Sequence, residues 1–209
     1  MERIRNISGG LYLIADAGLE ELVLREKLEE ALQNGVSIVQ LYNTENASVT
    51  VINKICTLCH SYQVPVLVNN NWHLLLTTLL DGVHFDSVPD NLAEIKNTVK
   101  REFYKGITCS NNLAVVQWAH DNQFNYLSFC SLFPSATAGS CEIVHFENIQ
   151  KARAITHLPF FAAGGINLHN LSQLAELPLN GIAVVSGIMA SDNIGLTTQK
   201  YLHELTKIS

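Results

Sequence analysis

The sequence is poor in charge and contains no long apolar run. Charged residues make up 15% of its 209 residues and hydrophobic ones 47%, which excludes a chain that is disordered for most of its length. No stretch of about 18 uncharged apolar residues occurs, and the polar start of the chain lacks an export signal. We therefore expect a cytoplasmic protein that does not bind a membrane.

Positive charge is scarce as well. The chain has 13 Lys and Arg residues against 19 Asp and Glu residues, so its net charge is -6. This charge repels a phosphodiester backbone, and no local basic patch offsets the repulsion. We therefore expect no nucleic-acid partner.

Cysteines are few and irregularly spaced. Their number, five, is odd and forms no disulfide framework, which predicts reduced thiols in a reducing compartment. Cys56-Thr57-Leu58-Cys59-His60 matches a covalent haem attachment pattern, but it falls in an apolar-periodic segment where cysteine serves as a small core residue. The sequence thus favours buried thiols over haem or zinc there, and the same interpretation applies to Cys109 and Cys130.

Short apolar runs alternate with segments of helical periodicity along the chain. Strands are predicted at residues 11–15, 36–41, 64–69, 82–85, 105–108, 126–130, 160–163 and 181–185. Helices are predicted at residues 19–33, 48–62, 72–79, 92–101, 113–120, 147–155, 168–176 and 197–206. Strands that are apolar on both faces and separated by helices require a parallel sheet with right-handed crossovers. Eight such repeats predict a compact (β/α)8 barrel, an α/β fold, as a single domain over residues 1–209.

The main rival fold is a flavodoxin-like or Rossmann sheet. That fold prefers five or six strands and, for dinucleotides, a Gly-x-Gly-x-x-Gly pattern after the first strand. Asp16-Ala17-Gly18-Leu19-Glu20 follows the first predicted strand here and has no such pattern. The barrel is therefore favoured.

The end of the predicted barrel carries the most informative motif. Gly164 and Gly165 follow the seventh strand, and Val185 and Ser186 follow the eighth. Glycines at this point let the backbone approach an anion, and the loops supply N–H groups at the start of a short helix. These residues are predicted to bind a phosphate monoester; a tight turn without a ligand is the alternative.

Other polar residues follow the remaining strands, where barrel chemistry gathers. The candidate lining residues are Gln40, Asn69, Thr108, Ser135 and Thr137. Ser135 and Thr137 belong to a hydroxyl-rich loop over residues 133–144, which is either a lid over the ligand or an ordinary solvated loop.

His84 and Thr108 are the candidate catalytic residues. His84, at the end of the fourth strand, is the histidine placed for general acid or base work. A structural histidine, hydrogen-bonded at the strand end, is the alternative, and it is favoured because the sequence shows no partner for His84.

Seven short motifs follow one another in the chain. They are VQL at 39–41, PVLVN at 65–69, DGVH at 81–84, GIT at 106–108, FPSAT at 133–137, GGI at 164–166 and VVSGI at 184–188. Together they resemble the thiamine phosphate synthase family, which includes thiazole tautomerase relatives. The resemblance implies a barrel that joins hydroxymethylpyrimidine diphosphate to thiazole phosphate, with Mg²⁺ helping the diphosphate to leave. It also implies a small heteroaromatic phosphate as ligand and a possible homodimer.

The chain departs from this family where the family carries charge. Gln40-Leu41-Tyr42-Asn43-Thr44 stands where the family has Gln-x-Arg-x-Lys, so the glutamine is kept and both cations are lost. Asn70 replaces an aspartate that holds magnesium in the family, and Ala138 replaces a lysine. Asp86 and Asp90 are the candidate substitutes as metal ligands, although neither is in register. None of the 13 Lys and Arg residues directly follows a predicted strand.

Three functions remain open on the sequence. The first is a divergent synthase, with Asp86 or Asp90 holding Mg²⁺. The second is an isomerase-like relative that moves protons through His84, because Ser131 stands where tautomerase relatives have a histidine. The third is a non-catalytic phosphate-ligand sensor, which has lost the charges for diphosphate and metal.

Overall fold

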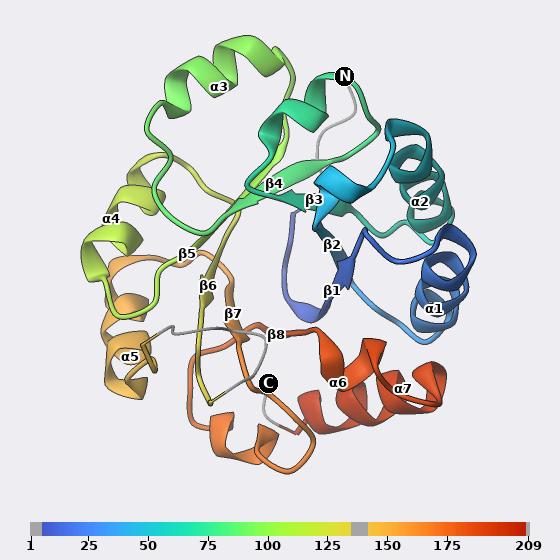
Figure 1. The fold of residues 1–209 in the computed structure, drawn as a ribbon. Helices are drawn as coiled ribbons and strands as arrows, with labels where there is room; N and C mark the ends of the chain where they lie inside the picture. Colours follow the sequence, from blue (N-terminus) through green and yellow to red (C-terminus); the bar gives the residue numbers. More distant parts are fainter. Residues whose placement is uncertain (1–5, 135–141, 208–209) are drawn as a thin grey trace.

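The computed structural model describes residues 6–134 and 142–207. Eight parallel strands form a closed barrel, in which each strand pairs with the next along the chain and β8 pairs with β1. Figure 1 shows this barrel at the centre of a ring of helices. The strands are β1 (Gly10–Asp16), β2 (Ile38–Tyr42), β3 (Val66–Asn69), β4 (Gly82–Phe85), β5 (Tyr104–Thr108), β6 (Tyr126–Phe129), β7 (Phe160–Ala163) and β8 (Gly181–Val184). The predicted (β/α)8 barrel is thus confirmed, with strand ends that differ from the prediction by no more than two residues.

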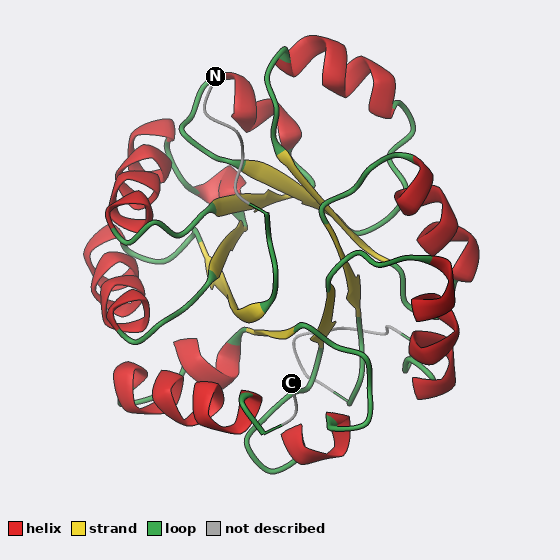
Figure 2. Ribbon diagram, turned by 180° about the vertical axis from the view of Figure 1, so that it is seen from behind, coloured by secondary structure: helices red, strands yellow, loops and turns green. Residues whose placement is uncertain are grey.

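Helices cover the outside of the barrel, as Figure 2 shows from the opposite side. The α-helices are α1 (Glu21–Gln33), α2 (Val49–Ser61), α3 (Leu92–Val99), α4 (Leu113–Asp121), α5 (Phe146–Ile155), α6 (Ser186–Met189) and α7 (Ile194–Leu205). Three short 3-10 helices complete the set: η1 (Thr44–Asn46), η2 (Trp72–Leu76) and η3 (Leu171–Leu174).

The α-helices predicted after the third and seventh strands are wrong, because η2 and η3 stand in their place. After η2, the hydroxyl and the backbone N–H of Thr78 both donate to the carbonyl of Leu74, at 2.6 and 3.0 Å. At η3, Asn167 and Asn170 bind nearby backbone groups before the helix starts, and Pro178 follows shortly after it.

The interior of the barrel is closed by large side chains. One buried cluster lies inside the strands, and a larger one lies between the strands and the helices. Tyr12, Tyr126 and Phe161 pack edge to face inside the barrel, with ring centroids 5.4–5.7 Å apart. This aromatic layer leaves the carboxyl ends of the strands as the place where a polar site is built.

The cysteines of α2 are core residues. Cys56 and Cys59 are fully buried, and burial raises the pKa of the Cys56 thiol to about 12. A thiol with such a pKa stays protonated at neutral pH and binds metal poorly. The structure thus agrees with the prediction of buried thiols in this segment. None of the helices within the described ranges has the length and hydropathy needed to cross a bilayer.

Candidate functional site

A chain of side-chain hydrogen bonds crosses the mouth of the barrel from β4 to β1. Asp86 directly follows β4, and its Oδ2 accepts hydrogen bonds from the amides of Asn69 (3.0 Å) and Asn70 (2.7 Å). Asn69 ends β3, and its Oδ1 accepts from Gln40 Nε2 at 3.0 Å. Gln40 lies on β2, and its Oε1 accepts from the hydroxyl of Tyr12 at 2.6 Å. The sequence-predicted residues Gln40, Asn69 and Asp86 are thus connected to one another.

This chain of hydrogen bonds continues through the barrel to β5. The hydroxyls of Tyr12 and Tyr126 lie 2.8 Å apart, and the hydroxyl of Tyr126 lies 2.9 Å from His84 Nδ1. His84 Nε2 lies 3.0 Å from Thr108 Oγ1. The rings of His84 and Tyr126 also stack, with an interplanar angle of 20°. His84 and Thr108, the two candidate catalytic residues, are therefore in direct contact, and His84 has the partners that the sequence did not reveal.

Burial keeps the titratable groups of this hydrogen-bond chain other than Asp86 uncharged. It lowers the pKa of His84 to about 4, even though the nearby carboxylate of Asp86 acts in the opposite direction. It raises the pKa of Tyr12 and of Tyr126 above the ordinary tyrosine value. At neutral pH the imidazole and both phenols are therefore neutral. His84 carries one proton, and its second nitrogen is available as an acceptor.

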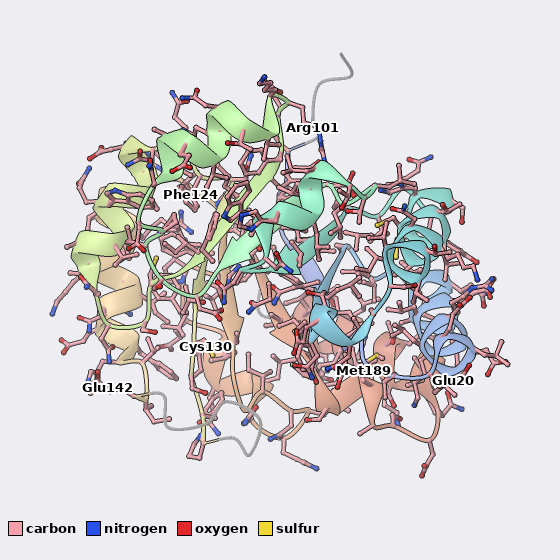
Figure 3. All side chains as sticks on the ribbon, turned by 45° about the horizontal axis from the view of Figure 1, so that its top comes forward. Glu20, Arg101, Phe124, Cys130, Glu142 and Met189 are labelled. Carbon is pink, nitrogen blue, oxygen red and sulfur yellow. The ribbon has the colours of Figure 1, made fainter. Side chains whose placement is uncertain are left out.

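A cavity of about 270 Å³ opens beside this chain, at the carboxyl ends of β6, β7, β8 and β1. It is lined by Ile14, Cys130, Pro134, Ala163–Asn167 and Ala183–Gly187. Figure 3 labels Cys130, which follows β6 at one side of this cavity. All four residues that the sequence assigned to phosphate binding, Gly164, Gly165, Val185 and Ser186, belong to this lining.

The two glycines after β7 are required by the backbone. Gly164 has φ +84° and Gly165 has φ +68°, a left-handed region that side chains other than glycine rarely adopt. A Cβ on Gly164 would overlap Ser131, and one on Gly165 would overlap the backbone carbonyl groups of Phe133 and Pro134. The loop after β7 can therefore lie directly on the loop after β6.

Three backbone amides, of Gly165, Ser186 and Gly187, belong to residues that line this cavity. Within the described part of the chain, no hydrogen bond is formed by the amides of Gly165, Ser186 and Gly187. Ser186 and Gly187 are the first two residues of α6, where N–H groups lack partners inside the helix. Such groups bind anions, and phosphate above all.

Positive charge is missing from the same region. No Lys or Arg lines the cavity among the residues described, and residues 135–141 contain none in the sequence. Tyr42 ends β2, and burial together with the Asp16 carboxylate raises the pKa of its phenol. Two carboxylates, Asp16 and Asp86, thus stand at the strand ends, while hydrogen-bond donors stand at β7 and β8.

The predicted metal ligands do not form a magnesium cage. Asp90 lies in an exposed turn before α3, and Asp86 already accepts two amide protons on one oxygen. Residues 6–134 and 142–207 contain no group of three or more His, Cys, Asp or Glu side chains able to hold a metal ion. Mg²⁺ needs an octahedron of oxygen ligands, so these residues do not fit the ion by themselves. Ser135 and Thr137 lie outside the described residues.

Two residues of the hydrogen-bond chain were missed by the sequence analysis, Tyr12 and Tyr126. Both lie at or next to the start of a predicted strand, whereas the candidate residues lie near or after the strand ends. The signal that finds them is alternation: Tyr12 is two residues from Ile14, which lines the cavity, so both side chains face the inside of the barrel. A buried tyrosine on an inward face normally has a hydrogen-bond partner for its hydroxyl.

A larger cavity, of about 610 Å³, lies at the amino ends of the strands. Its lining includes Ser8, Ser37, Pro65 and the ion pair of His60 with Asp81, whose atoms lie 2.8 Å apart. Size alone does not make it the site, because barrel chemistry is located at the carboxyl ends of the strands. We therefore assign the candidate site to the smaller cavity and the adjoining hydrogen-bond chain.

The fold and the position of the site define a (β/α)8 barrel that carries its polar residues at the carboxyl ends of the strands, as barrel enzymes do. The family model described as thiamine monophosphate synthase matches residues 11–188, and the chain belongs to this family.

Individual relatives agree with the family assignment. The chain is 26% identical to thiamine-phosphate synthase of Clostridium acetobutylicum over 91% of its own length and 92% of the relative's. It is 29% identical to thiamine-phosphate synthase of Nitrosococcus oceani, with 92% and 90% covered. The solved structure of thiamine phosphate pyrophosphorylase from Pyrococcus furiosus superposes with a TM-score of 0.78 at 24% identity, covering 95% of this chain and 96% of that one. This last comparison shows the fold.

Proposed function

We propose that the chain acts in thiamine biosynthesis by binding a small heteroaromatic phosphate monoester at the cavity above β7 and β8. The N–H groups of Gly165, Ser186 and Gly187, which form no hydrogen bond within the described residues, carry this proposal, because they offer donors to an anion in a cavity where no lysine or arginine is present among the described lining residues. A phosphate held by backbone donors needs no lysine or arginine. The carboxylates on the far side of the mouth disfavour a second anion.

Binding is the first test of this proposal. Titration calorimetry is expected to show that thiamine phosphate or thiazole phosphate binds at least about tenfold more tightly than the same compound without its phosphate, which corresponds to about 1.4 kcal/mol. Equal affinity for the phosphorylated and unphosphorylated compounds, or no heat for either, contradicts the proposal.

A variant of the loop after β7 supplies the matching structural test. Gly165→Ala places a Cβ in a left-handed residue and against two carbonyl groups, so it moves the loop that carries one of the donors. We expect it to weaken phosphate binding by about tenfold or more. Gly18→Ala, in the loop after β1 and without a positive φ, is the matched control and is expected to bind normally.

The second candidate function is the transfer reaction itself, which family membership favours. Its test is formation of thiamine phosphate from hydroxymethylpyrimidine diphosphate and thiazole phosphate with Mg²⁺, with loss of product when a chelator is added. In such a step the chain's own contribution would be to bind the monoester through the backbone amides at β7 and α6. Binding without turnover supports the sensor hypothesis, and turnover supports the synthase hypothesis.

A further inference from the structure

The hydrogen-bond chain through the barrel has two self-consistent arrangements of its protons. Each interior member, whether amide, phenol or imidazole, can donate on one side and accept on the other. Reversing one member forces the next to reverse, because two donors or two acceptors in contact leave a buried group unsatisfied. No buried side-chain N or O atom of the described residues lacks a partner, so the arrangement is complete in one direction or the other.

Asp86 removes this ambiguity at one end. An ionised carboxylate only accepts, so the atom of Asn69 that faces it, 3.0 Å away, is the amide nitrogen. The carbonyl oxygen of Asn69 therefore faces Gln40 and accepts from its Nε2. The carbonyl oxygen of Gln40 is then turned to Tyr12, whose hydroxyl donates to it.

The same donor–acceptor direction then holds as far as His84 and Thr108 at the other end of the hydrogen-bond chain. The single hydroxyl proton of Tyr12 is already used, so Tyr12 accepts from the hydroxyl of Tyr126. Tyr126 has likewise used its proton, so it accepts from an N–H at Nδ1 of His84. A neutral imidazole with a proton on Nδ1 has a lone pair on Nε2, and Thr108 donates its hydroxyl proton there.

We infer that Asp86 is a positioning residue that acts through four intervening side chains to fix His84 in the Nδ1–H tautomer and to commit the hydroxyl proton of Thr108 to His84. The hydroxyl of Thr108 can then only accept a hydrogen bond from a bound ligand, so a ligand group placed at Thr108 has to be a hydrogen-bond donor. This consequence for the ligand rests on the proposed function, whereas the inference about the tautomer of His84 is independent of it. The lowered pKa of His84, about 4, agrees with a ring that holds one proton at neutral pH.

Nitrogen-15 NMR of the ligand-free protein tests the inference directly. Long-range proton–nitrogen correlation distinguishes a protonated from an unprotonated ring nitrogen, and loss of signals in His84→Asn assigns the ring of His84. At pH 7 the wild-type protein is expected to show a protonated Nδ1 and an unprotonated Nε2 at His84.

Three variants then isolate the role of the carboxylate. Asp86→Ala removes the fixed acceptor, and we expect the Nε2 signal of His84 to shift toward the protonated position, because both proton arrangements become available. Asp86→Asn retains an oxygen that accepts from Asn69, so it is expected to keep the wild-type pattern. Asp90→Ala, an exposed carboxylate in the following turn, is the control for charge and is expected to leave the ring unchanged.

A proton on Nε2 in the wild-type protein overturns the inference, and so does an Asp86→Ala spectrum identical to that of the wild type. Should Asp86→Ala fail to fold, the wild-type tautomer remains the deciding measurement, because the inference requires the proton on Nδ1. All spectra are recorded without ligand, so a failure here is separate from a failure of phosphate binding in calorimetry.

Discussion

Gly106→Ala is expected to lower the free energy of unfolding by about 4 kcal/mol. Gly106 lies on β5, directly opposite Tyr126 of β6 in the sheet register. A Cβ on Gly106 would overlap the ring and the hydroxyl of Tyr126. That ring cannot move aside, because it is fully buried against His84, Tyr12 and Phe161. The expected cost combines overpacking with the loss of buried hydrogen bonds, and urea unfolding measures it.

A double-mutant cycle separates this steric cause from an effect of glycine on the unfolded chain. In a Tyr126→Val background the space above Gly106 is empty, and Gly106→Ala is then expected to cost less than about 1 kcal/mol. A similar cost in both backgrounds would show that Tyr126 is not the obstacle. The backbone of Gly106 has no positive φ, so alanine suits its conformation once the ring is gone.

His84 is expected to make the protein less stable as the pH falls from about 6.5 to about 4. Burial lowers the pKa of His84 to about 4 in the folded protein, whereas in the unfolded chain it is near 6.5. Between these values the unfolded chain binds a proton that the folded protein does not, so lowering the pH favours unfolding. The slope is about 1.4 kcal/mol per pH unit, and the full loss is about 3 kcal/mol.

Comparison with His84→Asn isolates this contribution, because the other titrating groups are shared. The difference in the free energy of unfolding between wild type and His84→Asn is expected to shrink by about 3 kcal/mol as the pH falls from 7 to 4. His60 is the control of opposite sign: its hydrogen bond with Asp81 raises its pKa, so its contribution is present at low pH and is lost as the pH rises through that pKa. A pH-independent difference for His84→Asn would show that the ring titrates normally in the folded state.

Most of the fold follows from local pattern. The β-branched and apolar runs end within two residues of the observed strands, because strands buried on both faces must be apolar throughout. The errors fall where side chains bind the backbone. Thr78 in one segment and Asn167 and Asn170 in the other bind nearby backbone groups where 3-10 turns replace the expected helices, and helical periodicity does not register such contacts.

The sequence brings together some residues that the structure also places together. Gly164, Gly165, Val185 and Ser186 line one cavity, because glycine and strand order mark one place on a barrel, and their role in phosphate binding stays a prediction. The partners of His84 were not found, since Tyr12 and Tyr126 lie 114 residues apart and meet only when the barrel closes. Asp86 does not align with the family's metal-binding aspartates along the sequence, yet its carboxylate lies within hydrogen-bond distance of both Asn69 and Asn70.

The edge-to-face packing of Tyr12, Tyr126 and Phe161 fills the middle of the barrel. The cavity at the carboxyl ends of the strands and the cavity at their amino ends have no lining residue in common. This packing lies between the rest of the barrel and substitutions at the carboxyl ends of the strands. Residues at the carboxyl ends of the strands, such as Tyr42 at the end of β2, can therefore be substituted while the aromatic packing in the middle of the barrel stays intact.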